Sequence, residues 1–129
     1  MAIISFNNNE IKVIDPSIFK DLSKLEYIHF RNNKIKILDP AIFYGLTELK
    51  AIEFSSNQIK KIDPSKFHGL LSIEKLILSH NQIETLYPCT FNGLSSLRKI
   101  NFRNNKIKFL DQSVFIGLDR LEIINFENN

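Results

Sequence analysis

Residues 25–48, which read LEYIHFRNNKIKILDPAIFYGLTE, decide how this chain folds. Apolar residues stand at Leu25, Ile28, Phe30 and Ile35, and Asn33 lies among them. The same pattern returns every 24 residues without an insertion or a deletion. The 129 residues therefore comprise five full repeats and the first nine residues of a sixth, bounded at 1–24, 25–48, 49–72, 73–96, 97–120 and 121–129. Repetition with a period of this length predicts a single solenoid domain over residues 1–129.

A short strand is predicted near the start of each repeat. Ile28 and Phe30 alternate along the chain, so their side chains point to the same face. About 20 residues separate one strand from the next, which is enough for successive strands to run parallel. Such strands are not stable alone, but stacked turns bury one continuous core. The predicted class is an α/β repeat solenoid, a right-handed superhelix with a short parallel β-sheet on its concave face.

The rest of each repeat is predicted to carry the chain back across the convex side. Asp-Pro pairs at 15–16, 39–40 and 63–64 favour a turn, because proline fixes its own φ and extends the residue before it. The segment that follows is long enough for only a turn or two of 3₁₀ or α-helix. Asp21 is expected to close this segment in the left-handed conformation in the first repeat. Glycines take that position later: Gly45, Gly69, Gly93 and Gly117.

Three columns of repeated side chains are predicted to be structural. Ten of the eleven phenylalanines fall at two repeat positions, which predicts two stacked aromatic spines in the core. One spine contains Phe6, Phe30, Phe54, Phe102 and Phe126, and the other contains Phe19, Phe43, Phe67, Phe91 and Phe115. Asn33 and its counterparts are expected to satisfy backbone groups at the corner after each strand. Outside these columns, we expect Phe109 to be half-exposed and Cys89 to be semi-buried.

The spacing Leu-x-x-Ile-x-Phe-x-x-Asn-x-Ile at 25–35 resembles the leucine-rich repeat family, in the 24-residue form typical of animal extracellular proteins. The convex segment Asp-Pro-x-x-Phe-x-Gly-Leu at 39–46 looks like that of Toll-type receptors, Slit-like guidance proteins and insect leucine-rich immune proteins. The resemblance implies a receptor, immune or adhesion module that binds protein or glycan ligands outside the cell or at its surface. Because cysteine-rich caps, a signal peptide and an Asn-x-Ser/Thr sequon are missing, we expect a fragment of a longer chain or a short product that lacks its ends. A cytoplasmic location is expected if residues 1–129 are the whole product.

Composition and motifs argue against several other functions. With 43% apolar and 24% charged residues, the chain is typical of a folded protein rather than a disordered one. No apolar run is long enough for a membrane span, and a net charge of +3 is too small to indicate a nucleic-acid partner. The single cysteine and three histidines do not repeat at metal-ligand spacing, and no nucleophile or phosphate-binding motif is present. We therefore expect no enzyme activity, cofactor or metal.

The concave face is the predicted site for a protein ligand. Side chains between the core positions of each strand project from this face, and they vary between repeats while the core does not. Mixed polar, charged and aromatic residues on a rigid sheet suit protein recognition. One predicted cluster consists of Tyr27, His29, Arg31 and Glu53, and a second, basic cluster consists of Lys75, Lys99 and Arg103. Tyrosine and arginine are enriched at binding hot spots, so Tyr27 and Arg31 are the expected anchors.

Two other functions remain open on the sequence. One is binding of a glycan or sulfated polyanion along a ridge of lysines in the loops after the strands: Lys12, Lys34, Lys36, Lys60, Lys61, Lys106 and Lys108. The other is a structural array that self-associates through uncapped ends. Apolar residues are expected to be exposed at those ends: Ile4, Phe6, Ile11 and Phe19 in the first repeat, and Val114, Phe115 and Leu118 in the last full one.

Overall fold

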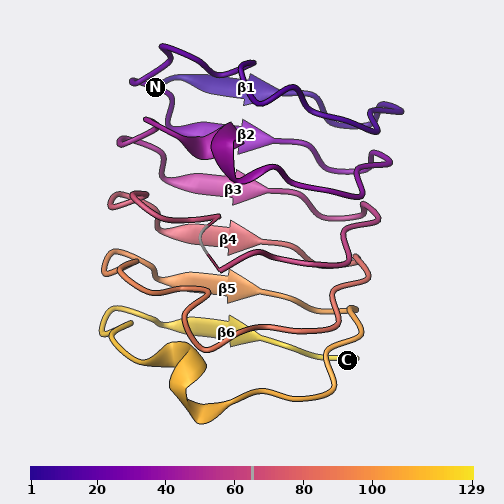
Figure 1. Cartoon of the computed structure of the whole chain (residues 1–129), viewed down its shortest axis with the longest axis vertical. Coiled ribbons are helices and arrows are strands. Elements are labelled where there is room, and N and C mark those ends of the chain that lie inside the picture. The colour runs from indigo at the N-terminus through magenta and orange to yellow at the C-terminus, as the bar shows by residue number, and fades with distance from the viewer. Residues whose placement is uncertain (65) are drawn as a thin grey trace.

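The computed structural model describes residues 1–64 and 66–129, and its strands form one parallel sheet in chain order (Figure 1). The six strands of the described residues are β1 (Ile3–Ser5), β2 (Tyr27–His29), β3 (Ala51–Glu53), β4 (Lys75–Ile77), β5 (Lys99–Asn101) and β6 (Ile123–Asn125). The register pairs each residue with its counterpart in the next repeat, as Ile28 with Ile52. Each strand is followed by a return segment, and the stacked turns form the predicted solenoid (Figure 1).

The return segments contain short 3₁₀ helices where the sequence predicts one or two helical turns. η1 spans Pro40–Phe43 and η2 spans Gln112–Phe115. The Asp39 carboxylate caps η1 by accepting a 2.8 Å hydrogen bond from the Ala41 amide, while Pro40 supplies the φ that a first helical residue needs. The backbone leaves this turn at Gly45 with φ of +80°, and Asp21 adopts φ of +66° at the matching position. The predicted left-handed residue is confirmed at both.

Two columns of phenylalanine fill the core, as predicted. Phe30 and Phe54 stack with ring centroids 5.1 Å apart and an interplanar angle of 11°. Phe43, from the second column, meets Phe54 edge-on at 6.3 Å, so the two spines contact one another. In the fourth repeat Leu78 takes the place of the strand-side phenylalanine and is fully buried.

The asparagine column forms a ladder of hydrogen bonds between neighbouring repeats. The Nδ2 atom of Asn57 donates to the carbonyl oxygens of Phe30, at 2.9 Å, and Phe54, at 3.0 Å. Its Oδ1 atom accepts from the Ile35 amide at 3.0 Å. One amide thus pairs three buried backbone groups that the corner of the turn leaves without a partner. The same set recurs at Asn33, Asn81, Asn105 and Asn129.

Three of the apolar residues expected to be exposed at the ends are buried, and the other four are half-buried against the core: Ile4, Phe6, Ile11 and Phe115. Phe19 is only 2% exposed, because its ring packs edge-on against Phe30 of the next repeat at 6.2 Å. Val114 and Leu118 are also buried, since they point inward against the core of the stack. At the C-terminal end of the sheet, Ile124 in β6 is half exposed.

Two further expectations about exposure were wrong. Cys89 is exposed rather than semi-buried, because it lies on the outside of a turn on the convex side. Phe109 is 73% exposed, which is more than the half-exposed side chain that the sequence predicted. Neither side chain faces the core, so the repeat pattern predicts the position of each residue in the turn but not the exposed fraction of its side chain.

Candidate ligand-binding surfaces

The concave face presents an aromatic pair at β2. Tyr27 and His29 project from this face, while Ile28 between them is fully buried. Their rings meet edge-on with centroids 6.5 Å apart. The contact holds two ring systems side by side at the surface, where they offer apolar area with little side-chain freedom left to lose on binding.

A hollow of about 500 Å³ lies beside this pair, over β3, β4 and β5. The predicted residues Arg31, Glu53 and Lys99 line it. Glu53 stands in register with His29 on one side and Ile77 on the other, so the hollow continues the surface that Tyr27 and His29 begin. The structure therefore joins members of the two predicted clusters in one surface.

The charges around the hollow are of both signs. Arg31 and Lys99 have no carboxylate within 4 Å among the residues at 1–64 and 66–129. Lys75 is the register neighbour of Lys99, so two ammonium groups lie on adjacent strands. Arg103 differs, because its Nε atom lies 3.5 Å from a carboxylate oxygen of Glu127. Part of the predicted basic cluster is thus neutralised within the protein.

Small side chains form the hollow, and sequence reasoning did not single them out. Ser55 and Ser79 are buried, and their hydroxyl oxygens lie 2.9 Å apart in a hydrogen bond between adjacent repeats. The matching positions in other repeats carry Asn7, Arg31 and Arg103. Two consecutive serines in a column of long side chains leave a gap, and this is the signal that could have located the hollow.

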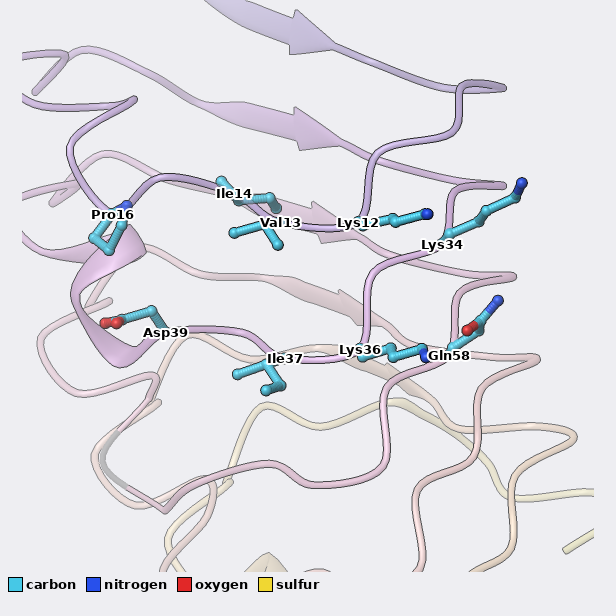
Figure 2. Close-up of a pocket in the computed structure, with 9 residues that line it drawn as sticks. All are labelled: Lys12, Val13, Ile14, Pro16, Lys34, Lys36, Ile37, Asp39 and Gln58. Atoms are coloured by element: carbon cyan, nitrogen blue, oxygen red, sulfur yellow. The ribbon is translucent and has the colours of Figure 1, made fainter.

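The lysines of the predicted ridge line a second surface, at the loops after the strands. A cavity of about 600 Å³ is bounded by Lys12, Lys34 and Lys36 and by the exposed aliphatic residues Val13 and Ile37 (Figure 2). Lys12, Lys34 and Lys36 project toward one side of the cavity in Figure 2, and the carboxylate of Asp39 lies on the other. Lys34 is ion-paired with Glu10 at 2.8 Å, which lowers the pKa of the glutamate.

Lys66 is a basic residue at a core position that sequence reasoning missed. It is 5% exposed, and its Nζ atom donates to the carbonyl oxygen of Leu38. Burial lowers the pKa of this ammonium group, and the carboxylates of Asp63 and Asp39 partly oppose the shift. Its repeat position carries Ile18, Ile42, Thr90 and Val114 elsewhere, so one lysine in an otherwise uncharged column was the available signal.

Neither surface contains an arrangement typical of a metal centre. Within the described part of the chain, no group of three or more histidine, cysteine, aspartate or glutamate side chains could hold a metal ion. The same part includes no helix long and apolar enough to cross a membrane.

Comparison with known proteins agrees with this geometry. The sequence model of the leucine rich repeat family matches three overlapping stretches, 2–59, 38–83 and 72–129. The chain belongs to the leucine-rich repeat family. No curated protein sequence matches it significantly.

Solved structures of leucine-rich repeat proteins share this fold over nearly the whole chain. TLR13, in its complex with ssRNA13, is 26% identical with a TM-score of 0.87, and 94% of the present chain matches 17% of that chain. A leucine-rich repeat protein of Leptospira interrogans, LIC12759, is 21% identical with a TM-score of 0.89, and all of this chain matches 32% of it. The leucine-rich repeat domain of APL1B is 21% identical with a TM-score of 0.84, with coverages of 92% and 35%. The present chain therefore spans about a third or less of each of these chains.

Proposed function

We propose that this chain is a non-enzymatic recognition module that binds a protein ligand on the concave face of its sheet. In this proposal it is part of an extracellular or cell-surface receptor, immune or adhesion protein. The resemblance of its convex segment to Toll-type receptors, Slit-like guidance proteins and insect leucine-rich immune proteins supports this. The concave site comprises the seven predicted residues: Tyr27, His29, Arg31, Glu53, Lys75, Lys99 and Arg103.

The hollow over β3–β5 is the observation that carries this proposal. Arg31 and Glu53 bring opposite charges to it, and Ile77 adds an apolar side chain. Protein surfaces supply all three kinds of contact, whereas a polyanion would meet the carboxylate of Glu53 unfavourably. The parallel sheet holds these side chains at fixed positions, so little freedom is lost when a ligand binds.

Tyr27 and Arg31 supply the anchors in this proposal. The tyrosine ring is held beside His29, and the guanidinium group of Arg31 has no carboxylate partner within the described residues. A ligand carboxylate could therefore pair with Arg31 without first breaking an internal ion pair. Lys75 and Lys99 then add a long-range attraction for an acidic ligand, which raises the rate of association more than the affinity.

This function is tested by passing extracellular fluid of the source organism over the immobilised chain and identifying what binds. The fluid is divided into untreated, nuclease-treated and glycosidase-treated samples before it passes over the immobilised chain, and the retained protein is identified by mass spectrometry. We expect a protein ligand whose affinity falls by at least about 2 kcal/mol in the double variant Tyr27→Ala/Arg31→Ala. The matched control Lys12→Ala/Lys36→Ala removes two charges from the other surface and should bind this ligand normally.

Two outcomes would contradict the proposal. Retention that is lost after nuclease treatment would indicate a nucleic acid, the class of ligand present in the TLR13 complex. Binding that survives the Tyr27/Arg31 change but is lost in the Lys12/Lys36 control would place recognition on the lysine ridge.

A further inference from the structure

Exposed aliphatic side chains stand between the lysines on the loops after the strands. Val13 is 81% exposed and Ile37, at the same position of the next repeat, is 78% exposed. Both line the cavity formed with Lys12, Lys34 and Lys36 (Figure 2). Large aliphatic groups this exposed remain in contact with water unless a ligand covers them.

The surface continues into the third and fourth repeats. A second cavity, of about 790 Å³, shares Lys36 and Ile37 with the first and adds Lys60, Lys61 and Tyr87. Two carboxylates, those of Asp39 and Asp63, also line it. We call the set Lys12, Val13, Lys34, Lys36, Ile37, Lys60, Lys61 and Tyr87 the basic flank. The fifth repeat has Lys108 and the exposed Phe109 at the positions of Lys12 and Val13, so the pairing of a lysine with an apolar residue recurs there.

Within the basic flank Lys34 is paired with Glu10 at 2.8 Å, but other lysines carry positive charge that no ion pair neutralises. Lys12, Lys36 and Lys60 have no carboxylate within 4 Å among the described residues. Asp39, the acidic residue of the first cavity, directs an oxygen to the Ala41 amide as a helix cap. The surface therefore favours an anionic ligand that can also cover apolar side chains.

We propose that the basic flank binds an anionic lipid membrane surface. Lysines near such a surface are attracted to acidic headgroups, and aliphatic side chains gain by entering the boundary between headgroups and acyl chains. A soluble sulfated polymer would satisfy Lys12 and Lys36 but would leave Val13 and Ile37 in water. A second copy docked flank to flank fits poorly, because the unpaired lysines Lys12, Lys36 and Lys60 of the two copies would face one another.

Vesicle flotation tests this proposal directly. The full chain is mixed with phosphatidylcholine vesicles, with or without about one-quarter phosphatidylserine, and the bound fraction is measured as a function of lipid concentration. We expect binding only to the acidic vesicles, with an affinity that falls as salt increases. Lys12→Gln/Lys36→Gln/Lys60→Gln should abolish it, and Val13→Ser/Ile37→Ser should weaken it about tenfold.

Matched variants separate this proposal from the other surface and from a polyanion site. Lys75→Gln/Lys99→Gln removes two charges from the concave face and should float like the wild-type chain. Binding to a heparin column should be unchanged by Val13→Ser/Ile37→Ser, because the aliphatic groups contribute only where a lipid boundary is present. Circular dichroism of every variant verifies that the solenoid is retained.

Three results would overturn the proposal. The first is no flotation with acidic vesicles at low salt. The second is flotation that Val13→Ser/Ile37→Ser leaves unchanged, which would indicate a general polyanion site. The third is loss of flotation in the Lys75/Lys99 variant, which would move the lipid contact to the concave face. None of these results depends on whether the concave face binds a protein.

Discussion

At the residue scale, Asn57 shows how one side chain joins two repeats. Its amide group donates to the carbonyl oxygens of Phe30 and Phe54 and accepts from the Ile35 amide, and all of these atoms are buried. Neither an aliphatic nor a charged residue of this size could donate and accept in these directions. The recurrence of asparagine every 24 residues is therefore a requirement of the backbone at the corner rather than of a ligand.

Removing this amide should destabilise the chain strongly. Asn57→Ala leaves three buried backbone groups without a partner, and each costs about 1–3 kcal/mol. We expect the free energy of unfolding in urea to fall by about 3 kcal/mol, which is much of the stability of a small domain. The exposed Asn92 on the convex side is the control, and Asn92→Ala should change the free energy by less than about 0.5 kcal/mol. Equal effects of the two changes would contradict the role given to the ladder.

The aromatic core makes a second prediction at this scale. Phe67 is 1% exposed and its ring lies 6.1 Å from that of Phe43, so Phe67→Ala removes a buried ring and leaves a cavity. We expect a loss of about 3–5 kcal/mol in the free energy of unfolding. Phe109→Ala removes the same group from an exposed position and should have almost no effect. A melting temperature of Phe67→Ala within about 2 °C of the wild type would contradict its place in the spine.

Lys66 makes a third prediction, about pH. Because burial lowers the pKa of Lys66 in the folded chain, the unfolded chain holds more protons between that pKa and the ordinary one near 10.4, and stability rises with pH across this window. Lys66→Ile matches Ile42 of the preceding repeat and should stabilise the chain near neutral pH by about 1 kcal/mol. The gain should shrink as pH approaches the ordinary lysine pKa. Urea unfolding of both proteins at several pH values measures this, and a gain that grows with pH would show that the ammonium group is well accommodated.

At the element scale, the 3₁₀ helices depend on local chemistry. η1 has four residues, so its ends account for most of its backbone groups. Asp39 pairs one exposed amide and Pro40 removes the need to pair another, which explains why an Asp-Pro step begins this turn. Asp111 caps η2 in the same way through Ser113, without a proline, and these hydrogen bonds lower the pKa of its carboxyl group.

Loss of the cap should weaken η1. Asp39→Ala removes the acceptor for the Ala41 amide and should reduce the free energy of unfolding by about 1 kcal/mol. Asp39→Asn keeps a side-chain oxygen that can accept the same bond and should be close to the wild type. Urea unfolding of the two variants is the measurement. If Asn destabilises as much as Ala, the charge of Asp39 matters rather than its hydrogen bond.

At the scale of the whole molecule, stability comes from contacts between neighbouring repeats. Ion pairs such as Lys24–Glu48 and Arg98–Glu122 also join residues 24 positions apart, but they are exposed and each contributes little. Burial of apolar side chains contributes most to stability. Ile52 and Leu76 in the middle strands are fully buried, whereas Ile124 in the last strand is half exposed. Repeats in the middle have two neighbours and those at the ends have one.

Hydrogen exchange should reveal this gradient. We expect the backbone amides of β3 and β4 to be protected most, and those of β1 and β6 to exchange at least about tenfold faster. The aliphatic residues of the basic flank do not support the sheet, so Val13→Ser/Ile37→Ser should leave the pattern unchanged. Equal protection in all six strands would show that the chain opens only as one cooperative unit.

The sequence by itself determined the strands, their register, the two spines, the asparagine ladder and the left-handed closing residues. The strands, the spines and the ladder join each repeat to the next, so the period places both partners at once, whereas the closing residues follow from local backbone geometry. Only the tertiary structure decided how exposed Phe19 and Cys89 are, that Lys66 is buried, and where the cavities lie. The reason is that exposure and hollows depend on the sizes of several neighbouring side chains, which vary from repeat to repeat. Ser55 and Ser79 illustrate this, since small side chains at the same position of two adjacent repeats leave the hollow on the concave face.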